Sequence, residues 1–177
     1  MLIDFFEDKK NNIYIWDALD IWFGLWQDSK YLAEKWYIVD AIDKDPIAMM
    51  KAKELNNHDK INFIQKDISV FVFSKKYDLI IAFLSLFNLS KSSAHKLFID
   101  SVNHLNYNGY IIIRLLWLQD ERKDEITTWD RKELEKEFLK NDGMKIVYLN
   151  ESFESKKTAL WKTKNRHFVD IIIKKDV

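Results

Sequence analysis

The stretch ALDIWFGLWQDS at residues 18–29 decides how the rest of the chain is interpreted. An apolar run expected to be a strand ends near Asp20, passes through a loop that contains Gly24, and leads into a charged segment with helical spacing. A strand, a tight turn and a helix in this order form the first half of a βαβ unit. Ligands of open α/β sheets bind beyond the carboxyl ends of the strands, so a binding site is expected at this turn.

The remaining chain repeats the alternation of short β-branched runs and longer amphipathic stretches. We expect strands at 17–21, 37–42, 61–65, 77–83, 110–116, 144–150 and 167–174, and helical segments at 1–8, 28–36, 47–56, 92–105 and 131–141. The last two strands, separated by a polar connection at 151–165, can pair as an antiparallel hairpin. The sequence therefore predicts one α/β domain over residues 1–177, a three-layer sandwich with a Rossmann-like, seven-stranded, mostly parallel sheet.

Composition narrows the class of protein. The 177 residues suit one domain, and the 28 basic residues balance the 28 acidic ones, so no overall basic field favours a nucleic-acid partner. The chain has no cysteine and no apolar run of membrane-spanning length, and its histidines lack metal-ligand spacing. A cytoplasmic protein with no metal and no membrane partner is expected, whereas its oligomeric state is not determined by the sequence.

Glycine is unusually scarce, with three glycines against seven tryptophans. Average usage near 7% predicts about 12 glycines in a chain of this length. Tight turns depend on glycine because it adopts positive φ without a steric cost. Either the turns are built unusually, or another residue stands at glycine positions.

Several later strands also end on residues suited to a ligand. Asp43 follows the second strand about 20 residues after the loop, as a ribose-binding acid of a βαβ unit does. Asp67 follows the third strand, Phe83 ends the fourth, and LNYNGYI at 105–111 precedes the fifth. Together with the loop, this ordered set resembles the class I S-adenosylmethionine-dependent methyltransferases, nearest the small tellurite-resistance methyltransferases.

The resemblance implies methyl transfer from S-adenosylmethionine to a small-molecule acceptor. It implies that Asp43 holds the ribose hydroxyls and that Asp67 faces the adenine amine. Arg166 and His167, beside the expected pocket mouth, are candidate acceptor contacts, and no residue stands out as a catalytic base. The full set of expected cofactor contacts is Asp20, Trp22, Gly24, Trp26, Asp43, Lys44, Asp67, Ile68 and Phe83.

Other interpretations stay open. Aspartate after a strand is common because aspartate also caps helices, so each acid taken alone has a structural explanation. One functional alternative is a catalytically inactive binding module on the same scaffold. A second is a nicotinamide-dependent oxidoreductase, which predicts no antiparallel C-terminal hairpin.

Tryptophan stands where the resembled family has glycine. The family loop is roughly Leu-Asp-x-Gly-x-Gly-x-Gly, and here Trp22 and Trp26 occupy two of its glycine positions. Our hypothesis is that the codon UGA, read as glycine in some bacterial lineages, has been read here as tryptophan. With two indoles in the loop, we expect cofactor binding to be severely weakened or abolished. Further candidates for the same exchange are Trp16, Trp36, Trp117 and Trp161, whereas Trp129 fits a genuine aromatic role.

Overall fold

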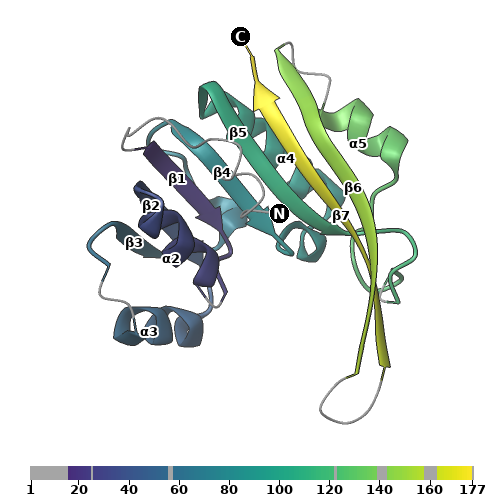
Figure 1. Ribbon diagram of the computed structural model, residues 1–177, viewed down its shortest axis with the longest axis horizontal. Helices are drawn as coiled ribbons and strands as arrows, with labels where there is room; N and C mark the ends of the chain where they lie inside the picture. Colours follow the sequence, from purple (N-terminus) through teal and green to yellow (C-terminus); the bar gives the residue numbers. More distant parts are fainter. Residues whose placement is uncertain are drawn as a thin grey trace.

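A computed structural model describes residues 16–24, 26–55, 58–121, 123–138, 143–157 and 163–176 of the chain. One sheet contains seven strands: β1 (Trp16–Ile21), β2 (Tyr37–Asp43), β3 (Ile61–Gln65), β4 (Tyr77–Phe83), β5 (Leu105–Leu116), β6 (Met144–Lys157) and β7 (Thr163–Lys175) (Figure 1). The helices are α2 (Gln27–Glu34), α3 (Pro46–Leu55), α4 (Lys91–Asn103) and α5 (Arg131–Phe138), with short 3-10 turns η1 (Ile68–Val70) and η2 (Leu86–Asn88).

The strand order is β3-β2-β1-β4-β5-β7-β6. The first five strands are parallel to one another, whereas β7 pairs antiparallel with both β5 and β6. This arrangement confirms the predicted Rossmann-like sheet, mostly parallel, with an antiparallel C-terminal hairpin.

Helices cover both faces of the sheet, so the molecule has three layers (Figure 1). On one face, Leu32 of α2 and Met49 of α3 pack in a cluster with strand residues such as Val39. On the other face, Phe98 of α4 and Leu134 of α5 belong to a second cluster. The central strands are buried on both sides, which explains the near-continuous apolar runs in their sequences.

The beginning of β5 differs from the prediction. The helix expected at 92–105 ends at Asn103, and β5 already begins at Leu105. The turn expected at Asn108 and Gly109 lies inside this strand, where its pairing with β4 shifts register. A Cβ atom at Gly109 would lie 2.8 Å from the backbone oxygen of Asn106, so glycine is required there. The turn residues thus make an irregularity within the strand.

The C-terminal hairpin is longer than predicted. The polar connection expected at 151–165 was wrong for most of its length, because β6 continues to Lys157 and β7 begins at Thr163. Ladder pairs such as Phe153 with His167 extend the two strands past the rest of the sheet (Figure 1). The helical segment expected at 1–8 lies outside the described residues, as do residues 139–141 of the helix expected at 131–141.

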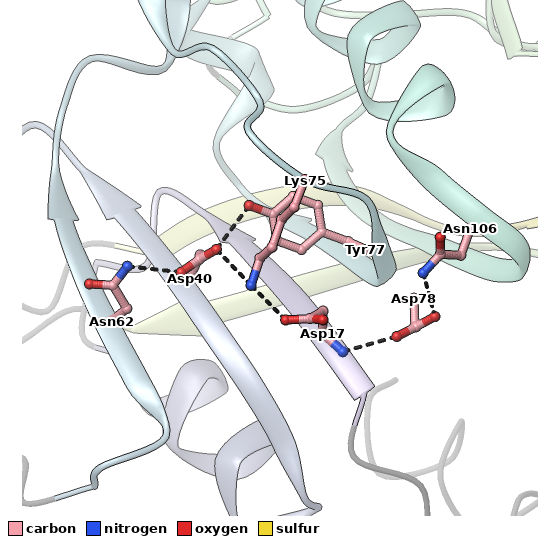
Figure 2. A network of polar contacts seen from close by, with 7 residues as sticks. All are labelled: Asp17, Asp40, Asn62, Lys75, Tyr77, Asp78 and Asn106. Carbon is pink, nitrogen blue, oxygen red and sulfur yellow. Dashed lines mark hydrogen bonds and ion pairs between the residues drawn. The ribbon is translucent and has the colours of Figure 1, made fainter.

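Seven polar residues near the amino ends of the parallel strands form a connected network, called the amino-edge network below (Figure 2). Asp40, which is 7% exposed, is its centre. Its carboxylate accepts hydrogen bonds from Asn62 Nδ2 and Tyr77 Oη, both at 2.9 Å, and lies 3.2 Å from Lys75 Nζ. Burial and the Asp40 carboxylate together raise the pKa of Tyr77 above its usual value. Asp40 is therefore fully supplied with side-chain donors.

The same network continues to β5 through Asp17 and Asp78. Lys75 Nζ also donates to Asp17, and these bonds to carboxylates raise the pKa of Lys75 even though burial opposes the shift. Asp78 accepts from the backbone N–H of Asp17 at 2.9 Å and from Asn106 Nδ2 at 2.8 Å. Side chains from the five parallel strands and from Lys75, two residues before β4, thereby fix this edge of the sheet (Figure 2).

Candidate functional site

The candidate site lies at the opposite, carboxyl edge of the sheet. The strand order reverses between β1 and β4, since β2 and β3 lie on one side of this pair and β5 on the other. Ligands of open α/β sheets bind at such a switch point. Asp20 lies next to the end of β1, Asp43 ends β2, Phe83 ends β4 and Asp67 follows β3. The structure therefore brings the predicted strand-end residues to one edge of the sheet.

Asp20 is buried, with 3% of its surface exposed. Its Oδ2 accepts a hydrogen bond from the hydroxyl of Ser29, a fully buried residue of α2. Burial raises the pKa of Asp20 to about 7, although the Ser29 hydrogen bond opposes the shift. Sequence reasoning missed Ser29, and the only signal was a small polar residue in the first turn after the loop. Asp20 thus joins the loop strand to the helix that follows it.

Asp43 holds the loop in place through backbone amides. Its Oδ2 accepts from the N–H of Gly24 at 3.0 Å and its Oδ1 from the N–H of Asp45 at 2.9 Å. Each carboxylate oxygen has a second acceptor site, so these bonds leave capacity for a further donor such as a ligand hydroxyl. The acid predicted from its distance to the loop is therefore bonded to that loop.

Asp67 is more open than the other two acids, with 42% of its side chain exposed. Its Oδ1 accepts from the N–H and the hydroxyl of Ser69, at 2.9 and 2.8 Å, and so caps η1. These hydrogen bonds lower the pKa of Asp67. Lys44 Nζ lies 3.5 Å from its Oδ2, while Ile68 is buried in the core beneath. Asp67 is thus a charged, accessible acceptor.

The loop between β1 and α2 has a left-handed backbone at three positions. The φ angles are 69° at Trp22, 51° at Gly24 and 52° at Trp26. A Cβ atom at Gly24 would meet only the oxygen of Trp22, at 3.9 Å, so space beside this glycine is open. The Trp22 indole is half-buried against the core, and Lys44 Nζ lies 5.3 Å from its ring centroid. This indole therefore lies next to the cation that pairs with Asp67.

An arginine–aspartate pair lies at the end of β5 and was missed by sequence reasoning. Arg114 donates from Nε and Nη2 to the two carboxylate oxygens of Asp170, at 2.6 and 2.7 Å, and its guanidinium lies 5.2 Å from the ring of Phe168. The two residues are direct cross-strand partners in the β5–β7 ladder. One charged residue in each of two apolar strands was the available signal.

Arg166 and His167 are held by the segment that follows β5. Arg166 Nη1 donates to Asp120 Oδ1 at 3.0 Å, and the backbone N–H of His167 donates to Asp120 Oδ2 at 3.1 Å. The His167 ring, 2% exposed, stacks on Phe153 with a centroid distance of 3.9 Å. The acceptor contacts predicted at these two residues thus lie at the carboxyl end of β5 in a packed setting.

Two classes of site find no support in the described part of the chain. No group of three or more histidine, cysteine or acidic side chains there could hold a metal ion. Within the same residues, no helix is both long enough and apolar enough to cross a membrane.

Comparison with known families decides the identity of this fold. Residues 8–122 match the family described as tellurite resistance protein TehB. The chain belongs to the TehB family. A comparison with curated protein sequences gives no match. The antiparallel pairing of β5 with β7, which the nicotinamide-dependent alternative lacks, agrees with this assignment.

Solved structures show the same fold at low identity. TehB from Haemophilus influenzae superposes with a TM-score of 0.80 at 18% identity, over 98% of this chain and 61% of that one. The chain therefore spans less than two thirds of that protein. An S-adenosylmethionine-dependent methyltransferase from Clostridium acetobutylicum gives a TM-score of 0.71 at 19% identity, over 97% and 89% of the two chains. The N-methyltransferase NodS from Bradyrhizobium japonicum, in complex with S-adenosyl-L-homocysteine, gives 0.69 at 15%, over 91% and 78%.

The residues of the site fit S-adenosylmethionine only in part. The acids of β1, β2 and the β3 end can accept hydrogen bonds from hydroxyl and amine groups, and Gly24 leaves open space. Trp22 does not fit, because its indole lies beside Lys44 on a loop whose backbone must approach a ligand closely. Trp26 adds a second indole to this loop, packed against the cluster of α2 and α3. The acids therefore favour binding of this cofactor, whereas the tryptophans in the loop oppose it.

Proposed function

We propose that this chain is an S-adenosylmethionine-dependent methyltransferase domain for a small-molecule acceptor, and that tryptophan at 22 and 26 impairs its cofactor binding. The observation that carries the proposal is the contact between Asp43 and the N–H of Gly24, which joins the ribose-type acid to the glycine loop. The TehB-family match and the S-adenosyl-L-homocysteine bound to NodS support the choice of ligand. The balanced charge supports a small acceptor over a nucleic acid.

We assign the predicted contacts to two groups within this proposal. Asp43, Lys44 and Asp67 are polar contacts of the nucleoside, and Ile68 and Phe83 are apolar neighbours. Asp20 acts through Ser29 and the start of α2, because its carboxyl group is bonded to the hydroxyl of that helix residue and makes no contact with the described loop backbone like that of Asp43. Arg166 and His167 are proposed to face the acceptor, supported by their position beside the end of β5, where His167 O accepts from the N–H of Trp117 at 2.7 Å.

Calorimetric titration with S-adenosyl-L-homocysteine tests the proposal. We expect no measurable binding to the chain with both tryptophans and micromolar binding to the variant Trp22→Gly/Trp26→Gly. Adding Asp43→Ala to that variant removes a charged acceptor and is expected to weaken binding about 10- to 100-fold. Adding Asp59→Ala, which alters an exposed turn, is the matched control and is expected to leave binding unchanged.

Two outcomes would overturn parts of this proposal. Micromolar binding to the chain with both tryptophans would refute the impairment. A stable glycine variant that binds no S-adenosyl-L-homocysteine would refute the cofactor assignment and favour the alternative, a binding module on the methyltransferase scaffold.

A further inference from the structure

The tryptophans of the described chain fall into two groups by backbone conformation. Trp22, Trp26 and Trp36 have φ angles of 69°, 52° and 73°. Positive φ brings Cβ too close to the following carbonyl oxygen, so bulky residues rarely adopt it. No positive φ occurs at the other tryptophans that the structure describes, which are Trp16, Trp117 and Trp129.

Left-handed positions in the described residues are mostly glycine or tryptophan. The seven residues with positive φ are Gly24, Gly143, the three tryptophans, Asn108 and Leu84. Asparagine tolerates this conformation, so Leu84 is the one other bulky residue among them. The chain has three glycines, yet three tryptophans lie in the backbone region where glycine is favoured. A single exchange of glycine for tryptophan explains both observations.

Trp36 shows this most clearly because it lies away from the cofactor loop. It follows the C-cap of α2, and its N–H donates to Ala33 O at 3.2 Å. A residue with positive φ just past the end of a helix is usually glycine. The Trp36 side chain is 60% exposed, and Lys60 Nζ lies 4.2 Å from its ring centroid. The indole therefore contributes little packing in return for an unfavourable backbone.

Trp117 and Trp129 have the opposite character. They are 4% and 5% exposed, belong to the core cluster beneath α4 and α5, and form a β-bridge with each other. Their side chains fill the core, so glycine at either position would leave a large cavity. These two residues are tryptophan by structural requirement, which corrects the expectation that Trp117 stands at a glycine position.

We propose that residues 22, 26 and 36 are glycine in the protein that the source cell makes, because a codon translated here as tryptophan is decoded there as glycine. Trp117 and Trp129 are then encoded by the ordinary tryptophan codon. The part concerning cofactor access at 22 and 26 rests on the proposed function, whereas the part concerning Trp36 does not.

The codons of the gene are the first test. The proposal expects UGA at 22, 26 and 36 and UGG at 117 and 129, so that the split between codons follows the split in φ. UGG at all three left-handed positions would overturn it.

Thermal unfolding of Trp36 variants is the second test. Trp36→Gly and Trp36→Ala remove the same indole, but alanine keeps the Cβ that conflicts with positive φ. We expect Trp36→Gly to melt about 2–4 °C above Trp36→Ala and above the unsubstituted chain. Trp129→Gly, at a buried position without positive φ, is the control and is expected to melt well below the unsubstituted chain. Equal or lower stability of Trp36→Gly than of Trp36→Ala would contradict the proposal.

The two proposals can fail separately. If Trp36→Gly stabilises the chain but Trp22→Gly/Trp26→Gly binds no S-adenosyl-L-homocysteine, the glycine assignment stands and the proposed function falls. If the glycine variant of the loop binds the cofactor product but Trp36→Gly gives no stabilisation, the exchange is refuted as a common cause and the proposed function stands.

Discussion

The two edges of the sheet use aspartate in opposite ways. At the amino edge, the carboxylate of Asp40 is bonded by the side chains of Asn62, Tyr77 and Lys75. At the carboxyl edge, Asp43 is bonded by the backbone amides of Gly24 and Asp45 instead. Both acids are buried, at 7% and 3% exposed, so they differ in their partners: side-chain donors occupy Asp40, whereas Asp43 orders a loop through two backbone amides and keeps unused acceptor capacity. Aspartate thus stabilises the sheet at one edge, and at the other it orders the loop that we propose to bind the cofactor.

The strongest test of the comparison is Asp40→Ala in the amino-edge network. It leaves the hydroxyl of the fully buried Tyr77 without its acceptor, whereas Lys75 Nζ loses one of two acidic partners and keeps Asp17. We expect it to lower the free energy of unfolding by about 2–4 kcal/mol, because a buried unsatisfied donor costs about 1–3 kcal/mol and the contacts of Asp40 with Lys75 and Asn62 are lost as well. Urea denaturation measures this effect. Asp124→Ala, at an exposed turn, is expected to change stability by less than about 0.5 kcal/mol, and an equal loss in both variants would break the comparison.

Asp20→Asn tests the carboxyl edge through the pH dependence of folding stability. The pKa of Asp20 is about 7 in the folded protein and 3.8 in its ordinary state, so between these values the folded chain binds a proton that the unfolded chain has lost. Stability from this group is full below about pH 4 and is lost as pH rises towards 7, at about 1.4 kcal/mol per unit. Asparagine keeps an oxygen for Ser29 and carries no charge. We expect the variant to gain about 2–3 kcal/mol relative to the parent at pH 8 and little at pH 4.

Denaturation curves at several pH values provide the measurement for Asp20. Asp28→Asn is the matched comparison, because burial also raises the pKa of Asp28 while the charge of Arg114 opposes the shift. We expect a change in the same direction and of smaller size. A parent protein whose stability is constant between pH 4 and 7, with Asp20→Asn parallel to it, would contradict the buried, protonated Asp20.

The smallest expected effect is that of Asp67→Asn. The hydrogen bonds from Ser69 lower the pKa of Asp67, so its contribution to stability is present above about pH 4 and is lost as pH falls through the lowered value. Since the side chain is 42% exposed, we expect a loss below about 1 kcal/mol at pH 7 and none at pH 2. Thermal unfolding at these two pH values measures the loss. A loss at pH 7 as large as that of Asp40→Ala would show that Asp67 is structural like the amino edge.

Much of this architecture follows from the sequence, for identifiable reasons. Both Ile61–Gln65 and Tyr77–Phe83 were predicted at their observed bounds. Tyr77–Phe83 is a central strand covered on both faces, so it is nearly all apolar, whereas the edge strand Ile61–Gln65 was indicated by its short run of apolar residues before Asp67. Because each acid lies at or near the end of a parallel strand, the sequence also predicted that the acids lie together at the carboxyl edge of the sheet. The hairpin itself was predicted but its length was not, because the residues added to each strand are mostly polar and carry no apolar pattern that indicates a strand. Nor was the Ser29–Asp20 bond, since a serine nine residues away gives no periodic signal.

The position of β7 has a consequence for how the sheet is completed. β7 lies between β5 and β6 but follows both in the chain, so β6 has no described neighbour in the sheet until β7 is in place. During synthesis, β5 and β6 therefore have unpaired edges until β7 is made. The apolar run Ile171–Ile173, which pairs with both strands, is synthesised after them. A chain truncated within β7 would have unpaired edges on β5 and β6, and exposed strand edges promote aggregation.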